Sequence, residues 1–334
     1  MTKKILVTGG LGYIGSHTVL DLIENGLTPV ILDDLSNANL KILENLELLS
    51  GSKITFYLGN FSDTRLLQKI FTEHQIDSII HFAAYKSVPE SIQHPLKYYQ
   101  NNIDGLKQLL NFLSMRKIKS FIFSSSAAIY SRLNCFPVTE QGMLSYENPY
   151  AFSKLCGEWL LNDFIKSNPN VCIGILRYFN PLGNHSSGLI GDFITKKNTN
   201  IMPMILRSLR DNSVFRIFGD EHETPDGSPV RDYIHVMDLA NSHSILHQFL
   251  INNNGIYTFN VGLGYGISVK KLIESFQSNN NVDLKIEVTS KREGDLPECY
   301  AANKNISEQL GWSPNYDLNT MCLDAYKFFK VNYQ

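Results

Sequence analysis

Six short runs of apolar and β-branched residues recur along the first half of the chain, each bounded by glycine, proline or polar residues. They are KILVTG from Lys4, PVILDD from Pro29, KITFYLGN from Lys53, IDSIIHFAA from Ile76, IKSFIFSSS from Ile118 and VCIGILRYFN from Val171. Such runs predict buried strands. Between them lie segments with helical periodicity, such as residues 16–26, where Val19, Leu22 and Ile23 share one face and Gly26 is a C-terminal stop.

Strand and helix alternate in this way as far as Asn180. The alternation predicts an α/β fold, a doubly wound parallel (Rossmann) sheet covered by helices on both faces. Beyond that point the rhythm breaks into loops, and a chain of 334 residues has room for about two domains. We therefore expect a smaller mixed α/β lobe at the C-terminal side. The predicted limits are 1–179 with a return of about 230–262 for the first domain, and 180–229 with 263–334 for the second.

Charge and cysteine content exclude several functional classes. A net charge of −2 gives no wide electropositive field, so a nucleic-acid partner is not expected. Five cysteines, widely spaced and without a C-x-x-C pair, suggest neither a disulfide framework nor a metal site, and favour a cytoplasmic location. The apolar run behind MTKK is too short for a signal peptide or a membrane span, so no membrane association is expected.

The first strand run leads into a glycine loop, LVTGGLGYIGSHT, with glycines at positions 9, 10, 12 and 15. Glycine at this spacing permits a tight turn, lets the backbone approach a pyrophosphate, and starts a helix whose N–H groups face the phosphates. About 20 residues on, the second run ends at Asp33, where a carboxylate accepts from ribose hydroxyls and repels a 2′-phosphate. The combination predicts a binding site for NAD rather than NADP. The alternative is a tight turn without a cofactor, followed by two exposed aspartates.

Tyr150 and Lys154 are four residues apart at the start of a predicted helix, so both can face one cleft. A fixed ammonium and a nearby nicotinamide cation stabilise a phenolate, which turns the pair into a base. Ser124, Ser125 and Ser126 end the preceding strand run, at the sheet edge where ligands of open α/β sheets bind. Taken alone, a tyrosine and a lysine at this spacing are more often an amphipathic helix surface; the glycine loop and the serine-ended strand favour the catalytic reading.

A set of motifs in this chain resembles one family. TGGLGYIGSH, HFAAYKSVPES, YYQNNIDG, FIFSSSAAIY, NPYAFSK, LRYFNPLG, VRDYIHVMDLA and KREGDLP occur in the order and at the spacings of the extended short-chain dehydrogenase/reductases. More narrowly, the chain is similar to the UDP-hexose 4-epimerases, from Lys4 to about Trp312. The resemblance implies an isomerase that oxidises the sugar at C4 with NAD, lets the 4-keto sugar rotate, and reduces it from the other face.

The resemblance also implies roles for individual residues. The catalytic residues would be Tyr150 as acid/base, Lys154 and Ser126. The cofactor side would comprise Gly9, Gly12, Tyr13, Ile14, Gly15, Asp33, Asn60, Phe61, Phe82, Lys86, Asn101, Tyr150, Lys154 and Tyr178. The sugar nucleotide would contact Lys86, Ser126, Tyr150, Asn180, Asn200, Phe218, Arg231, Arg292, Asp295 and Cys299. A homodimer through the helix after Asn102 and the helix carrying Lys154 is implied as well.

Arg231 and Arg292 are fork-shaped donors suited to a diphosphate. Without the resemblance, the favoured interpretation would be two surface arginines in solvated loops. One departure from the family pattern is Asn60, which replaces the usual aspartate that contacts adenine, and its amide oxygen can still accept. Cys299 stands where relatives restricted to non-acetylated hexoses carry a bulky tyrosine against the sugar ring. The resemblance therefore implies that the substrate range includes 2-acetamido sugars in addition to plain hexoses.

Three other functions remain alternatives. A nucleotide-sugar 4,6-dehydratase needs an extra acid directly after the strand serines, where this chain has Ala127 and Ala128. A net alcohol dehydrogenase would accumulate reduced cofactor in proportion to product. A non-catalytic NAD-binding regulator would not need the intact set of Ser126, Tyr150 and Lys154.

Overall fold

The computed structural model describes residues 4–195, 200–291 and 296–334. Within these ranges the chain divides into two compact units. The first contains residues 1–131, 143–178 and 240–259, and the second contains residues 132–142, 179–239 and 260–334.

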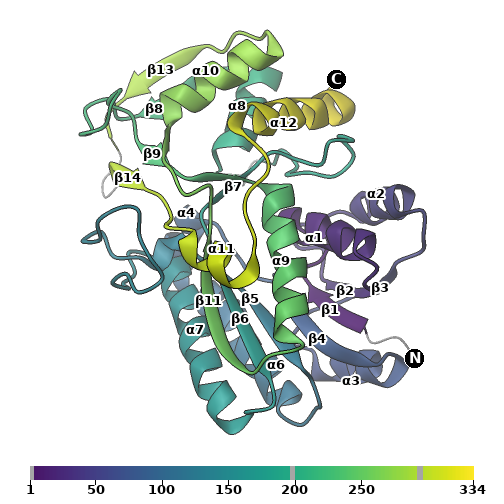
Figure 1. Ribbon diagram of the computed structural model, residues 1–334. Coiled ribbons are helices and arrows are strands. Elements are labelled where there is room, and N and C mark those ends of the chain that lie inside the picture. The colour runs from purple at the N-terminus through teal and green to yellow at the C-terminus, as the bar shows by residue number, and fades with distance from the viewer. Residues whose placement is uncertain (1–3, 196–199, 292–295) are drawn as a thin grey trace. The chain divides into compact units, whose positions relative to one another are not determined.

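The first unit is built on a seven-stranded sheet with helices on both faces (Figure 1). Its strands are β1 (Lys4–Thr8), β2 (Pro29–Asp33), β3 (Thr55–Leu58), β4 (Ile76–His81), β5 (Ser120–Ser126), β6 (Cys172–Tyr178) and β11 (Gly255–Val261). Its helices are α1 (Tyr13–Glu24), α2 (Leu40–Ser50), α3 (Thr64–Glu73), α4 (Val88–Gln93), α5 (Pro95–Tyr98), the π-helix η1 (Tyr99–Asp104), α6 (Gly105–Leu113), the 3-10 helix η2 (Ala127–Ile129), α7 (Pro149–Ser167) and most of α9 (Val236–Leu250).

Each of the six apolar runs forms a strand, which confirms the predicted doubly wound fold. The strand order is β11-β6-β5-β4-β1-β2-β3, and the five pairings from β6 to β3 are parallel. The order reverses between β1 and β4, and ligands of doubly wound sheets bind beyond the carboxyl ends of strands at such a point. The glycine loop leaves β1 at this position.

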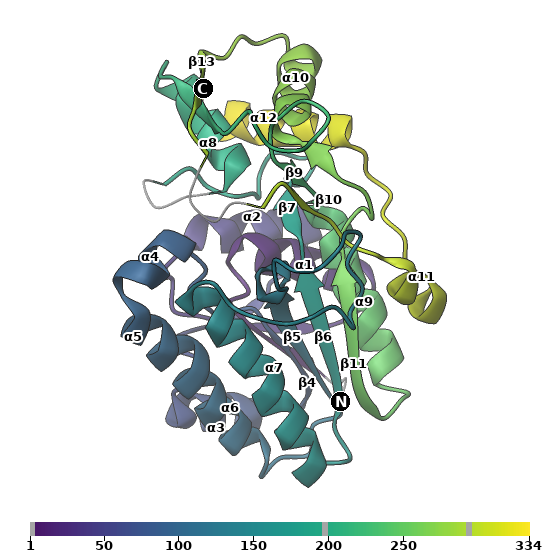
Figure 2. The ribbon, with the colours of Figure 1, turned by 90° about the vertical axis from the view of Figure 1, so that its left-hand side faces the viewer.

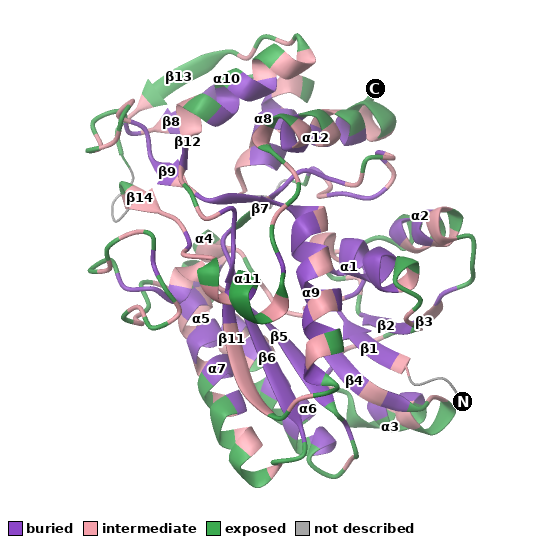
Figure 3. Ribbon diagram, viewed as in Figure 1, coloured by how far each residue is buried: buried purple, intermediate pink, exposed green. Residues whose placement is uncertain are grey.

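Burial explains why these runs read as continuous apolar stretches. Helices α3, α6 and α7 lie together on one face (Figure 2), and α1 and α9 cover the other, where Ser244 of α9 donates to Asp21 of α1. Strands covered on both sides have no solvent face to make polar, as the buried strands in Figure 3 show. The core between the sheet and the first group of helices includes Leu6, Ile79, Leu109, Phe121 and Ile173.

The second unit contains short strands and four complete helices among its described residues. They are β7 (Asn180–Leu182), α8 (Ile201–Arg210), β8 (Phe215–Phe218), β9 (Val230–Arg231), β10 (Tyr233–His235), β12 (Ile267–Ser268), α10 (Val269–Asn280), β13 (Ile286–Thr289), β14 (Glu298–Cys299), α11 (Lys304–Leu310) and α12 (Leu318–Tyr333). The strands form the small sheets β10-β7, β12-β9-β14 and β13-β8.

One buried carboxylate ties several of these segments together. Asp232, between β9 and β10, accepts from the backbone N–H groups of Leu263 (2.6 Å), Gly264 (3.1 Å) and Ala301 (3.0 Å). Burial raises the pKa of Asp232 to about 6, and the three hydrogen bonds oppose that shift. Strands of two or three residues form few backbone hydrogen bonds with each other. The three bonds to Asp232 therefore replace part of the stabilisation that longer paired strands would provide.

Candidate active site

The glycine loop after β1 folds so tightly that side chains are excluded from two of its positions. Gly9 has a φ of +71°, and a Cβ there would lie 2.7 Å from the backbone nitrogen of Ala83. A Cβ on Gly15 would overlap the carbonyl oxygen of Gly9. Gly12 is the N-cap of α1 and makes no side-chain cap, so the first N–H groups of the helix are presented to the loop. The loop therefore has the geometry that a dinucleotide pyrophosphate requires.

Asp33, at the carboxyl end of β2, braces this loop. Its Oδ2 accepts from the N–H of Leu11 (3.0 Å) and its Oδ1 from the N–H of Leu35 (2.9 Å). Burial raises the pKa of Asp33, and the two hydrogen bonds oppose that shift. Each carboxylate oxygen retains a lone pair, so the group can still accept from the two hydroxyls of a ribose.

Asn60, which replaces the usual aspartate, presents its NH₂ group rather than the amide oxygen that we expected. Its Oδ1 already accepts from the N–H (2.9 Å) and the hydroxyl (2.7 Å) of Ser62. Two bonds use both lone pairs of an amide oxygen, so the side chain can offer only its NH₂ group. The expectation that the Asn60 oxygen serves adenine is therefore not met by this geometry.

The segment carrying Lys86 is held by a residue that the sequence did not single out. Lys86 is exposed, with its ammonium 5.8 Å from the centre of the Tyr13 ring. Asn102 accepts from the N–H of Tyr85 (3.0 Å) and donates to its carbonyl oxygen (3.0 Å). It also donates to Ser153 Oγ on α7 (3.0 Å), and Asn101 donates to it (2.9 Å). Asn102 lies in η1, and π-helical turns inside helices are frequent at functional sites.

The start of helix α7 is fixed by its capping residues, which places Tyr150 in the first turn. Asn148 caps it by accepting from the N–H of Ala151 (2.9 Å), and Pro149 occupies the first helical position. Burial raises the pKa of Tyr150, and the neighbouring hydroxyl of Ser126, at the end of β5, opposes the shift. Serine and tyrosine are thus brought together as predicted from their positions.

Lys154 lies one turn further along α7 and is buried. Its ammonium donates to the carbonyl oxygen (2.6 Å) and to the hydroxyl (3.2 Å) of Ser124. Burial lowers the pKa of Lys154 to about 7. We expected the lysine to lower the pKa of the tyrosine, but desolvation is the largest influence on both groups here and favours their neutral forms.

The three strand serines therefore serve three different partners. Ser126 lies beside Tyr150 and Ser124 bonds Lys154, while Ser125 donates to Glu158 of α7 (2.5 Å). Glu158 in turn forms a buried pair with Arg177 of β6, through Nε to Oε1 (3.0 Å) and Nη2 to Oε2 (2.7 Å). This bidentate pair fixes α7 against β5 and β6. From the sequence, only Ser126 of the three was assigned a role in the site.

Two histidines that invite a catalytic reading are structural. His81 is buried, bonds Thr8 Oγ1 through Nδ1 (2.7 Å) and stacks on Phe123, and burial lowers its pKa to about 3. His235, in the second unit, accepts from the N–H of Met237 (3.0 Å) and stacks on Tyr316. Neither is needed as a base once Tyr150 takes that role.

Among the predicted sugar-nucleotide residues that the structure describes, Lys86, Ser126 and Tyr150 lie in the first unit and the others lie in the second. Arg231 and Cys299 are register partners on β9 and β14, and the Arg231 guanidinium donates to the carbonyls of Val230 and Leu296 (both 2.8 Å). Asn180 pairs with Tyr233 in the β10-β7 sheet, and Asn200 is the N-cap of α8. Arg292 and Asp295 lie outside the described residues.

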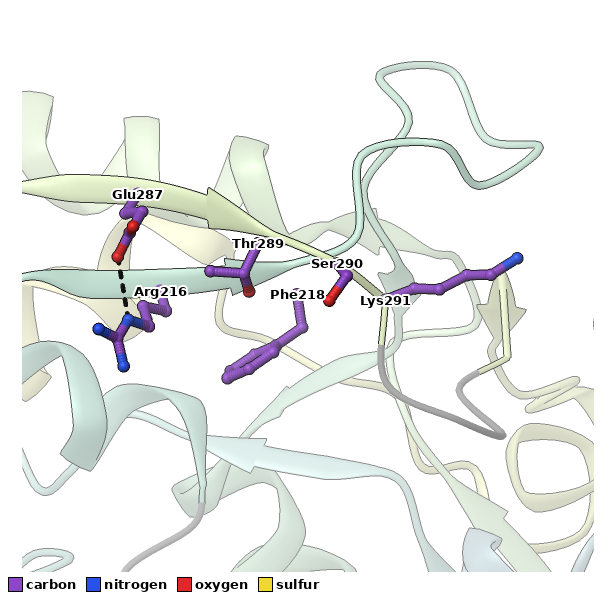
Figure 4. Close-up of a pocket in the computed structure, with 6 residues that line it drawn as sticks. All are labelled: Arg216, Phe218, Glu287, Thr289, Ser290 and Lys291. Carbon is purple, nitrogen blue, oxygen red and sulfur yellow. Dashed lines mark hydrogen bonds and ion pairs between the residues drawn. The ribbon is translucent and has the colours of Figure 1, made fainter.

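Phe218 lines a pocket in the same unit together with Arg216, Glu287, Thr289, Ser290 and Lys291 (Figure 4). Its ring projects from the end of β8, and Arg216 and Glu287 form an ion pair of 3.0 Å along the same wall. An aromatic face beside hydroxyl groups suits a planar, hydrogen-bonding base.

Comparison with known proteins agrees with this arrangement. A family model for GDP-mannose 4,6 dehydratase matches residues 6–325. A UDP-glucose 4-epimerase of Yersinia enterocolitica is 42% identical over 331 residues, which covers 98% of each chain. Among solved structures, a UDP-glucose-4-epimerase from Stenotrophomonas maltophila with bound NAD and formylated UDP-arabinopyranose superposes with a TM-score of 0.96, at 36% identity over 98% of each chain. The UDP-Glc/GlcNAc 4-epimerase of Campylobacter jejuni gives a TM-score of 0.85 at 34% identity, over 99% of this chain and 100% of its own.

A full-length match to both kinds of relative, together with the glycine loop and the Ser-Tyr-Lys group, places this chain in the extended short-chain dehydrogenase/reductase family, with the UDP-glucose 4-epimerases.

Proposed function

We propose that this protein is an NAD-dependent UDP-hexose 4-epimerase that interconverts UDP-glucose and UDP-galactose. The observation that carries the proposal is the position of Tyr150 in the first turn of α7, with the buried Lys154 one turn along the same helix and bonded to Ser124 of β5, at the sheet edge where the glycine loop leaves β1. Relatives about 40% identical over the full length carry the same named activity.

The residues divide the chemistry between them. Tyr150 takes the proton of the sugar 4-hydroxyl and later returns it, while Ser126 holds the same hydroxyl by a hydrogen bond. Lys154, when charged, favours the phenolate form of Tyr150. Bound NAD would supply reversible hydride acceptance at C4. The glycine loop suits its pyrophosphate, and Asp33 suits an unphosphorylated ribose.

Local structure argues against dehydration. A 4,6-dehydratase needs an additional acid after the strand serines, but here Ser126 leads directly into η2, which begins with Ala127 and Ala128. Two methyl groups cannot protonate a leaving hydroxyl. The family model bears a dehydratase name, and this difference separates the chain from that activity.

The direct test is to incubate the purified protein with UDP-glucose and identify the product by NMR. We expect UDP-galactose, in a mixture that is also reached from UDP-galactose. Formation of a 4-keto-6-deoxy sugar would indicate a dehydratase instead. Reduced cofactor in proportion to product would indicate a net dehydrogenase.

We further propose that the substrate range includes UDP-N-acetylglucosamine and UDP-N-acetylgalactosamine. Cys299 stands where a tyrosine would occupy space beside the sugar ring, and its thiol is a small apolar group: burial raises its pKa to about 11, so it carries no charge at neutral pH. The space left by the missing phenol suits an acetamido group at C2. A solved relative, from Campylobacter jejuni, is named as a UDP-Glc/GlcNAc 4-epimerase.

A size series at position 299 tests this extension. Cys299→Tyr should abolish turnover of UDP-N-acetylglucosamine and leave UDP-glucose turnover nearly unchanged, whereas Cys299→Ser, the control of similar size, should leave both unchanged. Wild-type protein that is inert towards UDP-N-acetylglucosamine contradicts the proposal outright.

The residue assignments and the assembly are part of the same proposal. Asn180, Asn200, Phe218 and Arg231, with Arg292 and Asp295, would bind the nucleotide and sugar.

We also propose a cytoplasmic homodimer. Support for the dimer comes from α7, where Trp159 is 52% exposed, whereas the leucines of α6 are buried in the unit's own core. Five free cysteines suit a reducing compartment. No described helix has the length and apolar content to span a bilayer. Light scattering of the purified protein tests the dimer.

A further inference from the structure

One buried carboxylate of the second unit lies beside three of the proposed sugar-nucleotide residues and has no part in the proposed chemistry. Asp232 follows Arg231 directly in the chain and is fully buried. Its backbone N–H donates to the carbonyl oxygen of Cys299 (3.1 Å), and its own carbonyl oxygen accepts from the N–H of Asn180 (3.0 Å). Arg231, Cys299 and Asn180 therefore meet at the backbone of Asp232.

The side chain of Asp232 joins β9 to its neighbours on both sides, because β9 lies between β12 and β14 in its small sheet. Its carboxylate accepts from the N–H groups of Leu263 (2.6 Å) and Gly264 (3.1 Å), in the segment that precedes β12. It also accepts from the N–H of Ala301 (3.0 Å), two residues after Cys299 of β14. With a pKa of about 6 the group is ionised at neutral pH and can only accept, which settles the direction of all three bonds.

The segment that carries Cys299 is held along both of its edges. Asp232 binds one edge, as described above. On the other edge Val138 donates its N–H to the carbonyl oxygen of Tyr300 (3.0 Å) and accepts from the N–H of Ala302 (2.8 Å). The bonds to Val138 join backbone groups only, so the edge at Asp232 is the one that a side-chain substitution can loosen.

Short strands make the pairing of Arg231 with Cys299 depend on the Asp232 carboxylate. Strands β9 and β14 contain two residues each, and Arg231 is the register partner of Cys299. Strands of this length exchange few backbone hydrogen bonds, and a slip of one residue turns every side chain to the opposite face. The bonds to Asp232 therefore fix the face on which the two side chains lie.

We propose that Asp232 is a positioning residue for substrate binding: by holding the segments on both sides of β9, it places Arg231 against the diphosphate and Cys299 against the sugar of a UDP-hexose. Asp232 acts only through these two residues and does not contact the substrate. The inference rests on the proposed function, and it assigns the cost of losing Asp232 to binding rather than to the chemical step.

A second buried carboxylate of the same unit supplies a matched control. Asp238 is 1% exposed and accepts from the backbone N–H groups of Asn315 (2.9 Å) and Tyr316 (3.0 Å). None of these three residues is a proposed substrate or cofactor residue. Asp238→Asn therefore removes an equivalent buried charge and equivalent bonds to the backbone without loosening β9.

Kinetics of the holoenzyme with UDP-glucose give the first test. Asp232→Asn keeps the size of the side chain, but its NH₂ group faces backbone donors and cannot accept from them. We expect KM to rise by about tenfold or more and kcat to stay within about threefold, since Ser126, Tyr150 and Lys154 lie in the first unit. Asp238→Asn should keep KM within about twofold of wild type. An unchanged KM in Asp232→Asn, a larger loss in kcat than in affinity, or an equal rise of KM in both variants overturns the proposal.

A second variant displaces the carboxylate without removing it. A Cβ added to Gly262 would overlap the carboxylate of Asp232, whose atoms are the three nearest to it. Gly262→Ala should therefore raise KM in the same direction as Asp232→Asn, with the buried charge and all three N–H donors retained. This variant decides the question if Asp232→Asn does not fold. A wild-type KM in Gly262→Ala, with folding checked by circular dichroism, contradicts the positioning role.

Calorimetric titration of UDP-glucose into each holoenzyme separates the positioning role from the proposed function. We expect the Kd of Asp232→Asn to be raised by about tenfold or more and that of Asp238→Asn to match wild type. The content of bound NAD should be equal in all three proteins, because the predicted cofactor residues lie in the first unit. If wild-type protein does not bind UDP-glucose, the proposed function fails and the inference fails with it. If wild type binds and epimerises UDP-glucose but Asp232→Asn binds it equally well, the positioning role alone fails.

Discussion

The proposed chemistry depends most directly on the hydroxyl of Tyr150. We expect Tyr150→Phe to fold and to keep its cofactor, because the ring and its packing are retained, but to lose more than about a hundredfold in turnover. Tyr146→Phe is the control, since this residue is half-exposed, four positions earlier, and packs against Phe152. Steady-state kinetics with UDP-glucose measure both variants. Near-normal turnover in Tyr150→Phe contradicts the catalytic assignment.

The buried ammonium of Lys154 should make the free energy of unfolding depend on pH. Its pKa falls from 10.5 to about 7 on folding, so between these values the unfolded chain binds one more proton than the folded protein. Stability should therefore rise with pH across this window, by at most about 1.4 kcal/mol per unit. Lys154→Met removes this contribution.

The variant should be more stable than wild type at pH 7, and the difference should shrink towards pH 10. Urea unfolding of nucleotide-free protein at several pH values measures it. A difference that stays constant with pH would show that the ammonium is not desolvated as the structure indicates.

Individual residues differ in how far the sequence could predict them. Tyr150 and Lys154 follow from helical spacing, and Asp33 follows from the end of a strand run. By contrast, the contacts of Asn102 with Tyr85, of Ser124 with Lys154 and of His243 with Tyr178 join residues that are 17 to 65 positions apart. A lone histidine on an apolar helix face gives no local signal of its partner, so only the folded structure identifies it.

At the scale of elements, the buried pair of Glu158 and Arg177 holds α7 against the sheet. Glu158→Gln should destabilise the protein by about 3–5 kcal/mol, because it leaves the Arg177 charge buried without its partner. The matched control is Asp163→Asn on the same helix, which breaks the exposed Lys166 pair and should cost less than about 1 kcal/mol. Urea unfolding monitored by circular dichroism compares them. Equal effects in the two variants would refute the role given to the buried pair.

Regular elements of the first unit were predictable because the apolar runs alternate with periodic helices and, apart from the edge strand β3, form largely buried strands. The second unit offers no such signal. Strands β9, β12 and β14 have two residues each, and their pairing depends on the Asp232 carboxylate and on residues distant in sequence. The domain limits given from the sequence stay a prediction. Residues 132–142 cluster with the second unit, but no sequence pattern in them indicates that assignment.

At the scale of the whole molecule, a cofactor that is regenerated in every turnover has no need to dissociate. We therefore expect the purified protein to contain NAD and no appreciable NADP, because Asp33 would repel a 2′-phosphate. Acid release followed by enzymatic assay of both nucleotides measures this. Asp33→Asn should weaken the preference against NADP. Recovery mainly of NADP from the wild-type protein contradicts the carboxylate argument.

The central claim is that C4 is inverted by removal and return of its own hydrogen, and isotope labelling tests it most directly. UDP-glucose carrying deuterium at C4 is incubated with the protein in ordinary water, and the product is examined by NMR and mass spectrometry. We predict UDP-galactose that keeps its deuterium at C4, because the hydride leaves and returns without meeting solvent. Product with ordinary hydrogen at C4, or no inversion at all, contradicts the account.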